Sequence, residues 1–286
     1  MYGLEISRLF FMKKNIGIQG IKGSFHHIVA NNYFGKEIHL AEFLSFEEMI
    51  YNLNNGKIDY AVMAIENSTA GSIIPNYALI DEYDIHIVGE YYLQITHNLM
   101  ALKGQSLKDI KEVQSHPMAL LQCRDFFKNN SDITLVEEKD TAQIAKKIAD
   151  NKVKGLGAIA SELACKTYDL EIIQENIQTI KKNQTRFVIL KNIRPSENKN
   201  INKASLKFEL DHKRGSLATI LNVLSDCKLN LTKIQSMPKI QTPWRYSFFV
   251  DVTFDIKEHY LKAKSIVEIM AKEFKVLGEY KNSKDD

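Results

Sequence analysis

The stretch YAVMAIE, residues 60–66, indicates the fold class, because an unbroken apolar run ends there at an acidic residue. A short continuous run of this kind is typical of a strand buried on both faces of a sheet. Working outward, shorter apolar runs at residues 16–19 and 38–43 precede it, and a segment with helical spacing follows each of the three. This alternation predicts a mostly parallel α/β sheet covered by helices on both faces.

The same alternation returns after residues 85–102, a longer strand-rich stretch that predicts a crossing between two lobes. The second round comprises strands at 112–114, 134–138 and 157–160, helices at 117–127, 141–151 and 162–168, and a last strand at 185–190. Two α/β lobes joined by two crossings would leave a cleft between them, which is a common location for a small ligand.

A polar, proline-containing stretch, IRPSENKNINK at residues 193–203, predicts a linker to a smaller domain. Beyond it the pattern is strand, helix, strand, strand, helix, strand, at 204–210, 216–227, 229–237, 245–254, 260–273 and 275–280. This βαββαβ order is that of a ferredoxin-like domain. The predicted limits are a possible N-terminal extension at 1–12, a two-lobed domain at 13–192, the linker, and the small domain at 204–281.

The composition excludes several classes of protein. With 286 residues, 44% hydrophobic and 26% charged, the chain is an ordinary globular protein of two domains. A net charge of +3, spread over scattered Lys residues, predicts no nucleic-acid partner. Three distant cysteines, Cys123, Cys165 and Cys227, indicate no disulfide framework and favour a reducing, cytoplasmic compartment. The sequence has neither an apolar run long enough to span a membrane nor a secretory signal, so no membrane association is predicted. Met12 is a possible native start.

Four junctions between a predicted strand and a predicted helix are rich in Gly, Ser, Thr or Asn, at residues 20–25, 66–72, 115–117 and 140–141. The unpaired N–H groups at the start of a helix can hold a carboxylate or a phosphate. Each junction alone is explained by ordinary helix capping. Two of them on facing lobes would form a site for a doubly anionic small molecule.

The motifs of nucleotide and metal sites are absent from the sequence. The first junction has neither the spacing of a phosphate loop nor that of a dinucleotide-binding fingerprint. The pair His26-His27 has no third ligand at a useful spacing, so no metal site is predicted. Glu66 follows an apolar strand and is either a helix-capping group or a partly buried acid. Arg186 lies near the start of a predicted strand, where its side chain meets either an anion or solvent.

Five motifs, in order along the chain, make it resemble the prephenate dehydratase family from about residue 14 to residue 280. They are GSF at 23–25, AVMAIENSTAGSI at 61–73, VQSHPMALLQC at 113–123, NQTRF at 183–187 and, in the last domain, GSL at 215–217 with NLTKIQSMP at 230–238. The resemblance implies a two-lobed fold like that of type II periplasmic binding proteins, followed by a regulatory ACT domain. It implies no metal or organic cofactor and a cytoplasmic homo-dimer or homo-tetramer.

The activity that this resemblance implies is the conversion of prephenate to phenylpyruvate, water and carbon dioxide, on the route to L-phenylalanine. The resemblance implies that Thr185 is the residue essential for dehydration. We interpret its hydroxyl as a preorganised hydrogen-bond donor to the departing oxygen. We interpret Glu66 as the proton source behind it and Arg186 as the partner of the side-chain carboxylate. The predicted substrate-binding residues are Ser24, Phe25, Asn67, Ser68, Ser115, Arg186 and Phe187. Phe187 either packs beside the substrate ring or belongs to the core.

Phenylalanine is the allosteric ligand that the resemblance implies for the last domain. The residues predicted to bind it are Gly215, Ser216, Leu217, Asn230, Leu231, Gln235 and Ser236. Gln235 and Met237 stand where the family has Glu and Arg, so contacts made through that Arg are lost. Two alternatives remain open: arogenate as the substrate, and a non-catalytic sensor of small ligands on the same fold.

Overall fold

A computed structural model describes residues 13–195, 200–239, 242 and 245–284. The described chain folds into two compact units. The first contains the described residues up to Gly71 together with Tyr92–Phe187, and the second contains Ser72–Tyr91 and the residues from Val188 onward. The predicted extension at residues 1–12, including the possible start at Met12, lies outside the described residues. No helix in the described part is long and apolar enough to cross a bilayer.

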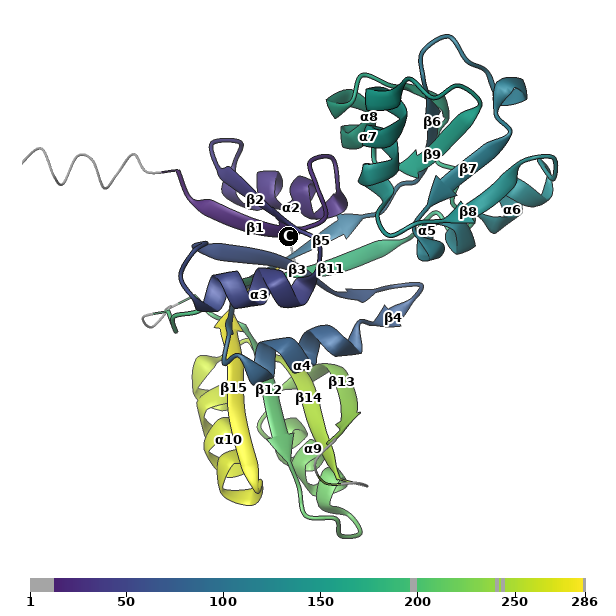
Figure 1. The fold of residues 1–286 in the computed structure, drawn as a ribbon. Coiled ribbons are helices and arrows are strands. Elements are labelled where there is room, and N and C mark those ends of the chain that lie inside the picture. Colours follow the sequence, from purple (N-terminus) through teal and green to yellow (C-terminus); the bar gives the residue numbers. More distant parts are fainter. Residues whose placement is uncertain (1–12, 196–199, 240–241, 243–244, 285–286) are drawn as a thin grey trace, which may run out of the picture. The chain divides into compact units, whose positions relative to one another are not determined.

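The first lobe of the first unit is a mostly parallel sheet with its helices packed on the central strands (Figure 1). Its elements are β1 (Asn15–Gln19), α2 (Phe25–Phe34), β2 (His39–Phe43), α3 (Phe46–Asn54), β3 (Tyr60–Asn67) and the start of β11 (Gln184–Lys191). The strand order is β2-β1-β3-β11, and β1 runs parallel to both of its neighbours. Ile65 and the residues before it on β3 from Ala61 are buried, as the apolar run predicts.

The second lobe has a sheet in the order β10-β6-β9-β7-β8. Its elements are β6 (Asn98–Ala101), a 3-10 turn at Leu107–Asp109, β7 (Glu112–Ser115), α5 (Pro117–Gln122), α6 (Arg124–Lys128), β8 (Thr134–Glu137), α7 (Thr141–Asn151), β9 (Leu156–Ala160), α8 (Glu162–Thr167) and β10 (Glu171–Gln174). On β6, Met100 packs with α7 and α8, whereas Leu99 and Ala101 pack with α5 and α6. Helices therefore cover both faces of this sheet (Figure 1).

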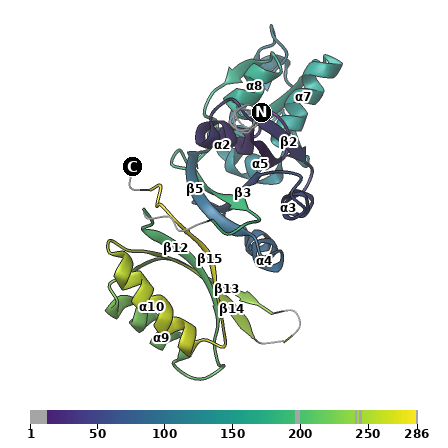
Figure 2. The same ribbon diagram turned by 90° about the vertical axis from the view of Figure 1, so that its left-hand side faces the viewer.

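The second unit contains the predicted βαββαβ arrangement. Its elements are α4 (Ile74–Glu82), most of β5 (His86–Gln94), β12 (Lys203–Glu209), α9 (Ser216–Asp226), β13 (Asn230–Pro238), β14 (Tyr246–Thr253), α10 (Lys257–Met270) and β15 (Glu273–Tyr280). The strand order is β13-β14-β12-β15-β5, antiparallel except where β15 meets β5. Helices α9 and α10 lie side by side on one face of this sheet (Figure 2).

The two faces of β12 differ sharply in chemistry. Ala204, Leu206 and Phe208 belong to the apolar core under α9 and α10. The alternate residues Lys203 and Lys207 are also buried, and they form ion pairs with Glu90 of β5 and with Asp81 of α4, respectively. These pairs explain why Ser72–Tyr91 groups with the second unit, whereas the sequence assigned it to the first domain.

Two expectations about local structure are wrong, and one strand was not expected. The segment after β3 is no helix start, because a turn and the short strand β4 (Gly71–Ser72) precede α4. The helix predicted at 117–127 is split at Cys123, whose backbone leaves the helical region at φ −103° and ψ 11°. Strand β10 was not expected, because its four residues have too little pattern to recognise and depend on pairing with β6.

Candidate functional site

Asn67, the last residue of β3, has a side-chain orientation that its own turn determines. Its Oδ1 accepts hydrogen bonds from the backbone N–H groups of Thr69 and Ala70, both at 2.9 Å. Because Oδ1 is used by two donors, the amide nitrogen Nδ2 must face the other way. There it donates to Thr185 Oγ1 at 2.8 Å and to Asn183 Oδ1 at 2.7 Å. The turn therefore fixes the direction of the hydrogen bond that reaches Thr185.

Four neutral side chains, Asn67, Thr69, Gln122 and Asn183, form a closed ring of hydrogen bonds that we call the amide ring. Asn183 Nδ2 donates to Gln122 Oε1 at 2.9 Å, and Gln122 Nε2 donates to Thr69 Oγ1 at 3.1 Å. The Thr69 hydroxyl completes the circuit by donating to Asn67 Oδ1 at 2.7 Å. All donors point the same way around the ring, so its members hold each other in one orientation.

His97, in the connection between β5 and β6, forms a hydrogen bond with the amide ring. Its Nε2 lies 2.8 Å from Gln122 Oε1, which can only accept, so this nitrogen carries the proton. Burial lowers the pKa of His97, and the hydrogen bond to Gln122 offsets only part of that effect. The ring of Phe25 packs edge-on against His97, with centroids 5.7 Å apart. The imidazole is therefore a neutral donor, and it brings Phe25 beside the site.

Thr185 and Phe187 lie on one face of β11, because successive side chains of a strand alternate. Phe187 is 1% exposed and packs edge-on against the buried His26 at 5.0 Å, which favours the core role for it. Arg186 alternates to the opposite face of β11 and is 4% exposed. Alternation along the strand directs its side chain away from that of Thr185, and its predicted contact with a carboxylate stays a prediction.

Ser24 caps α2 as the sequence predicts, and its Oγ accepts a hydrogen bond from His27 N at 3.3 Å. The preceding Gly23 lies directly against α8 of the second lobe, where a Cβ atom would come within 2.7 Å of the Ala164 Cα. The Ser161 hydroxyl also donates to the Gly23 carbonyl at 2.5 Å. The first junction therefore forms part of the contact between the lobes.

The other predicted residues have local roles. Ser115 is fully buried and its hydroxyl donates to the Ile159 carbonyl, so the structure does not bring it to the site. Ser68 is exposed and its Oγ accepts from Gln184 N at 2.9 Å, which ties the turn to β11. Neither Asn67 nor Ser68 is a donor at a helix start, because β3 continues into a turn here. Glu66 is half-buried at the end of β3.

A cavity of about 220 Å³ adjoins the amide ring and is lined by three of its members, Thr69, Gln122 and Asn183. Arg124 and Asp125 contribute charged groups to the same cavity. The sequence reasoning nominated none of Thr69, Gln122, Asn183, His97 or Arg124. Thr69, Gln122 and Asn183 lie within three of the recognised motifs, which was the signal available for them.

The residues predicted to bind phenylalanine fall into two groups within the second unit. Ser216 and Leu217, at the start of α9, line a cavity of about 120 Å³ together with Arg245 and Tyr246. The residues on β13 lie on the edge strand of the sheet and do not line that cavity. Gly215 has φ 83°, which suits glycine at the start of this helix.

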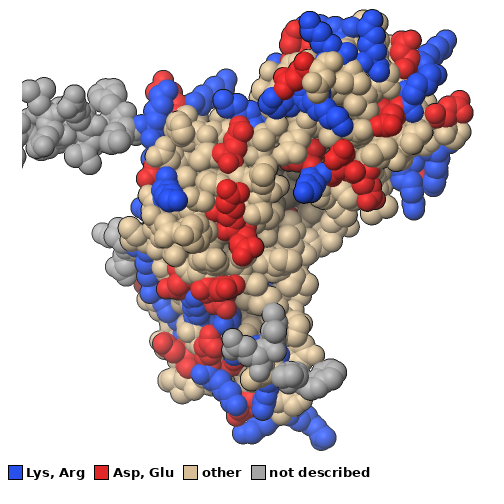
Figure 3. Space-filling model, in the orientation of Figure 1, with Lys and Arg blue, Asp and Glu red and all other residues tan. Residues whose placement is uncertain are grey.

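Neither metal ligands nor the distribution of surface charge indicates a further site in the described residues. Among the described residues there is no group of three His, Cys, Asp or Glu side chains that could hold a metal ion. His26 and His27 are used locally, since His26 Nε2 accepts from Ala64 N and His27 Nδ1 accepts from Gly23 N. On the face in Figure 3, basic and acidic side chains are interspersed.

The two α/β lobes, the neutral donors around Thr185 and the βαββαβ unit define a small-molecule enzyme with an appended ferredoxin-like domain. The chain belongs to the prephenate dehydratase family, whose family model, described as "Prephenate dehydratase", matches residues 16–194. It is therefore a hydro-lyase of the carbon–oxygen lyase class.

Curated relatives agree with this assignment. A bifunctional chorismate mutase/prephenate dehydratase of Buchnera aphidicola is 33% identical, over 94% of this chain and 71% of that protein. The prephenate dehydratase of Methanocaldococcus jannaschii is 39% identical, over 69% of this chain and 71% of that protein. An arogenate dehydratase/prephenate dehydratase of Arabidopsis thaliana is 34% identical, over 93% of this chain and 72% of that protein.

Solved structures share the fold over nearly the whole chain. Prephenate dehydratase of Staphylococcus aureus superposes with a TM-score of 0.81 at 26% identity, over 94% of this chain and all of that one. The prephenate dehydratase of Arthrobacter aurescens in complex with L-Phe superposes with a TM-score of 0.82 at 22% identity, over 95% of this chain and 91% of that one. A quorum-quenching acylase, GqqA, superposes with a TM-score of 0.84 at 24% identity, over 95% of this chain and 99% of that one. The expected two-lobed α/β fold is confirmed, and the acylase shows that this fold alone does not decide the reaction.

Proposed function

We propose that this chain converts prephenate to phenylpyruvate, water and carbon dioxide, and that Thr185 donates the hydrogen bond to the departing ring oxygen. The observation that carries the proposal is the 2.8 Å hydrogen bond from Asn67 Nδ2 to Thr185 Oγ1. Because Asn67 donates to this oxygen, the hydroxyl proton of Thr185 must point elsewhere. The described chain offers it no acceptor, so the proton is available to a substrate oxygen.

The neutral amide ring suits a substrate that already carries two carboxylates. A donor that is fixed before the reaction stabilises charge on the leaving oxygen without reorganisation. A carboxylate near the Thr185 hydroxyl would instead repel the substrate and accept the proton itself. The departing ring carboxylate should be held less tightly than the side-chain carboxylate, because stabilising its charge opposes decarboxylation.

Glu66 in its protonated, uncharged form is the proposed proton source behind Thr185, since it is half-buried and adjacent to Asn67 in the chain. Replacing it with Gln keeps the size of the side chain and removes the titrating group. We expect the acidic limb of the pH–kcat profile to shift in Glu66→Gln. An unchanged profile would assign the proton to another group.

A direct assay tests the proposed reaction. Purified full-length protein is incubated with prephenate at neutral pH, and phenylpyruvate is followed against an enzyme-free control because prephenate is acid-labile. We expect protein-dependent formation of phenylpyruvate. Absence of product, with binding of prephenate retained, would favour a non-catalytic sensor.

Arogenate is the second candidate substrate, and the plant relatives of 34% identity and above named for that activity favour testing it. Arogenate carries an amino group where prephenate carries a keto oxygen, so the two differ away from the departing hydroxyl. Parallel measurement of kcat/KM with both substrates would decide between them. We expect the higher value with prephenate.

We also propose that the βαββαβ unit is an ACT domain that binds L-phenylalanine and inhibits the reaction. Ser216 and Leu217 line a cavity there, and the structure of the Arthrobacter aurescens enzyme contains L-Phe. The edge strand β13, with Ile234 42% exposed, suits pairing between copies in a cytoplasmic homo-dimer or homo-tetramer. An unchanged rate at saturating phenylalanine would overturn the inhibition.

A further inference from the structure

The cavity of about 220 Å³ that adjoins the amide ring also has an apolar lining. Met118, Leu121 and Ile180 line it, and these side chains are 37%, 57% and 55% exposed, respectively. A single exposed apolar side chain needs no explanation, but three that line one cavity form a surface for an apolar group. The volume is below that of a site for a drug-sized ligand, so the cavity has room for one small molecule or part of one.

Arg124 gives this cavity a cation without an ion-pair partner. Within the part of the chain that the structure describes, its guanidinium forms neither a hydrogen bond nor an ion pair. The neighbouring Asp125 also lines the cavity, but its carboxylate pairs with Lys128 at 3.0 Å. Lys128 is the main cause of the lowered pKa of Asp125, and the charge of Arg124 adds to it. Asp125 is therefore ionised and paired, whereas Arg124 has no such pair.

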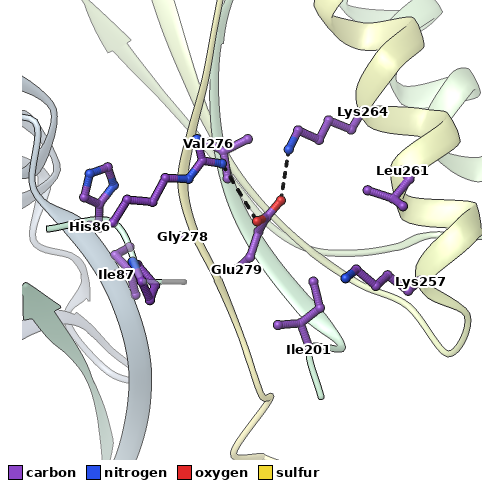
Figure 4. A pocket seen from close by; sticks show the side chains of 11 residues that line it. His86, Ile87, Ile201, Lys257, Leu261, Lys264, Val276, Gly278 and Glu279 are labelled. Carbon is purple, nitrogen blue, oxygen red and sulfur yellow. Dashed lines mark hydrogen bonds and ion pairs between the residues drawn. The ribbon is translucent and has the colours of Figure 1, made fainter. Parts of the chain in front are cut away.

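The cavity of about 240 Å³ in the second unit differs in this respect (Figure 4). Glu279 there accepts a hydrogen bond from Lys264 Nζ at 3.1 Å, and one of its oxygens lies 3.9 Å from Arg194 Nη2. These charged groups of the lining are engaged with each other. The cavity beside the amide ring is the one with an unengaged cation, and a ligand with a carboxylate would engage it.

The amide ring connects this cavity to Thr185. Asn67 Nδ2 donates both to Asn183 Oδ1, at 2.7 Å, and to Thr185 Oγ1, at 2.8 Å, so one side chain joins the lining of the cavity to the proposed donor. In prephenate the keto-carboxylate side chain lies across the ring from the departing hydroxyl. A substrate whose hydroxyl lies at Thr185 therefore needs a cation further along. Arg186 does not supply it on this side, because it alternates to the opposite face of β11.

Building on the proposed function, we propose that Arg124 binds the side-chain carboxylate of the substrate in this cavity, with the substrate's carbon skeleton against Met118 and Leu121. A guanidinium holds a carboxylate through two parallel hydrogen bonds. Asp125 then lies beside the position that differs between the two candidate substrates, and its carboxylate attracts the amino group of arogenate. Because Lys128 already engages Asp125, this attraction is weak and the site favours prephenate.

Steady-state kinetics with prephenate tests the role of Arg124. In Arg124→Gln we expect KM to rise at least tenfold with little change in kcat, since the carboxylate does not react and is held equally before and during the reaction. Arg124→Lys keeps the charge without the paired donors and should recover part of the loss. The matched control is Lys182→Gln, which removes an exposed lysine next to Asn183 that does not line the cavity. It should leave KM unchanged.

Two further variants test the choice of substrate, measured as kcat/KM for arogenate relative to prephenate. Asp125→Asn removes the attraction for the amino group, so we expect this ratio to fall by about threefold or more. Lys128→Gln removes the competing partner of Asp125, so the ratio should rise by about two- to fivefold, as for an exposed ion pair. An equal ratio in these two variants would overturn the role of Asp125.

Equal KM for prephenate in Arg124→Gln and Lys182→Gln would overturn the role of Arg124, provided that thermal melting shows both variants folded. Calorimetric binding of prephenate to Thr185→Ala, with and without Arg124→Gln, separates this proposal from the proposed reaction. If the protein converts neither substrate but Arg124→Gln still weakens binding at least tenfold, the reaction is wrong and the cavity assignment stands. Equal binding to both proteins, or binding to neither, would overturn the assignment.

Discussion

Two polar networks organise this chain, and they use opposite chemistry. The amide ring in the first unit holds Thr185 through side chains without charge, at distances of 2.7 to 3.1 Å. In the second unit, Lys203 donates to both oxygens of Glu90 at 2.9 Å, and Lys207 pairs with Asp81 and Glu273 at 2.7 Å. We call this second network the charged face.

The difference teaches what each network is suited to do. A ring of amides and hydroxyls fixes the direction of each hydrogen bond, since every group has a defined donor and acceptor side. It adds no net charge to a site proposed for a dianion. The two charges of a buried ion pair attract each other strongly over a short distance. Removing one of them is strongly destabilising, because the other is then buried without a partner. These pairs hold α4 and β5 to the sheet of the second unit.

The largest effect should follow from breaking the charged face at Glu90. In Glu90→Ala the ammonium of Lys203, whose side chain is 3% exposed, keeps its burial and loses its main partner. We expect the free energy of unfolding to fall by about 3–5 kcal/mol, measured by urea denaturation.

A double variant, Glu90→Met with Lys203→Met, is the control for that prediction. Replacing both ions by apolar side chains is often neutral or stabilising. We expect the double variant to be more stable than Glu90→Ala. The reverse order would mean that the pair contributes more than the cost of burying it.

The second largest effect should come from the amide ring and should appear in catalysis rather than in stability. Thr185→Ala removes the donor to the departing oxygen, and we expect kcat to fall by roughly 10²–10³. Thr185→Ser retains a hydroxyl and should recover much of the rate. Steady-state kinetics with prephenate measures both, with Gln184→Ala, which truncates the exposed side chain next to Thr185, as the control. Undiminished turnover in Thr185→Ala would remove it from the mechanism.

Acid should weaken the first lobe through His26. Burial lowers the pKa of His26 from 6.5 to about 3, so the folded state binds this proton less readily than the unfolded chain. The contribution to stability is complete above pH 6.5 and is lost as pH falls toward 3, at up to roughly 1.4 kcal/mol per pH unit. Urea denaturation at several pH values should show a shallower slope in His26→Gln. Equal slopes would mean that other groups cause the acid sensitivity.

The smallest effect should come from His97, which contributes one neutral hydrogen bond to the amide ring. His97→Phe keeps a planar side chain against Phe25 and removes the donor to Gln122. We expect kcat to fall by roughly three- to tenfold, with little change in KM. A change confined to KM would instead make His97 a determinant of substrate binding.

Local pattern predicted most of the fold, because it depends on periodicity. The apolar run on β3 and the cap at Ser24, whose Oγ accepts from His27 N at 3.3 Å, match the structure closely. Helix α7 begins and ends at the predicted residues. Motifs brought Asn67 and Thr185 into consideration. Their mutual contact could not be predicted, since 118 residues separate them in the chain.

The sequence by itself determined that β12 is a strand and that Ala204, Leu206 and Phe208 share one face, because side chains alternate along a strand. Only the tertiary structure decided that Lys203 and Lys207 on the other face are buried, since their acidic partners come from a distant part of the chain. Alternation is local and needs no partner. Pairing a buried charge, like closing a ring of amides, requires segments that only folding brings together.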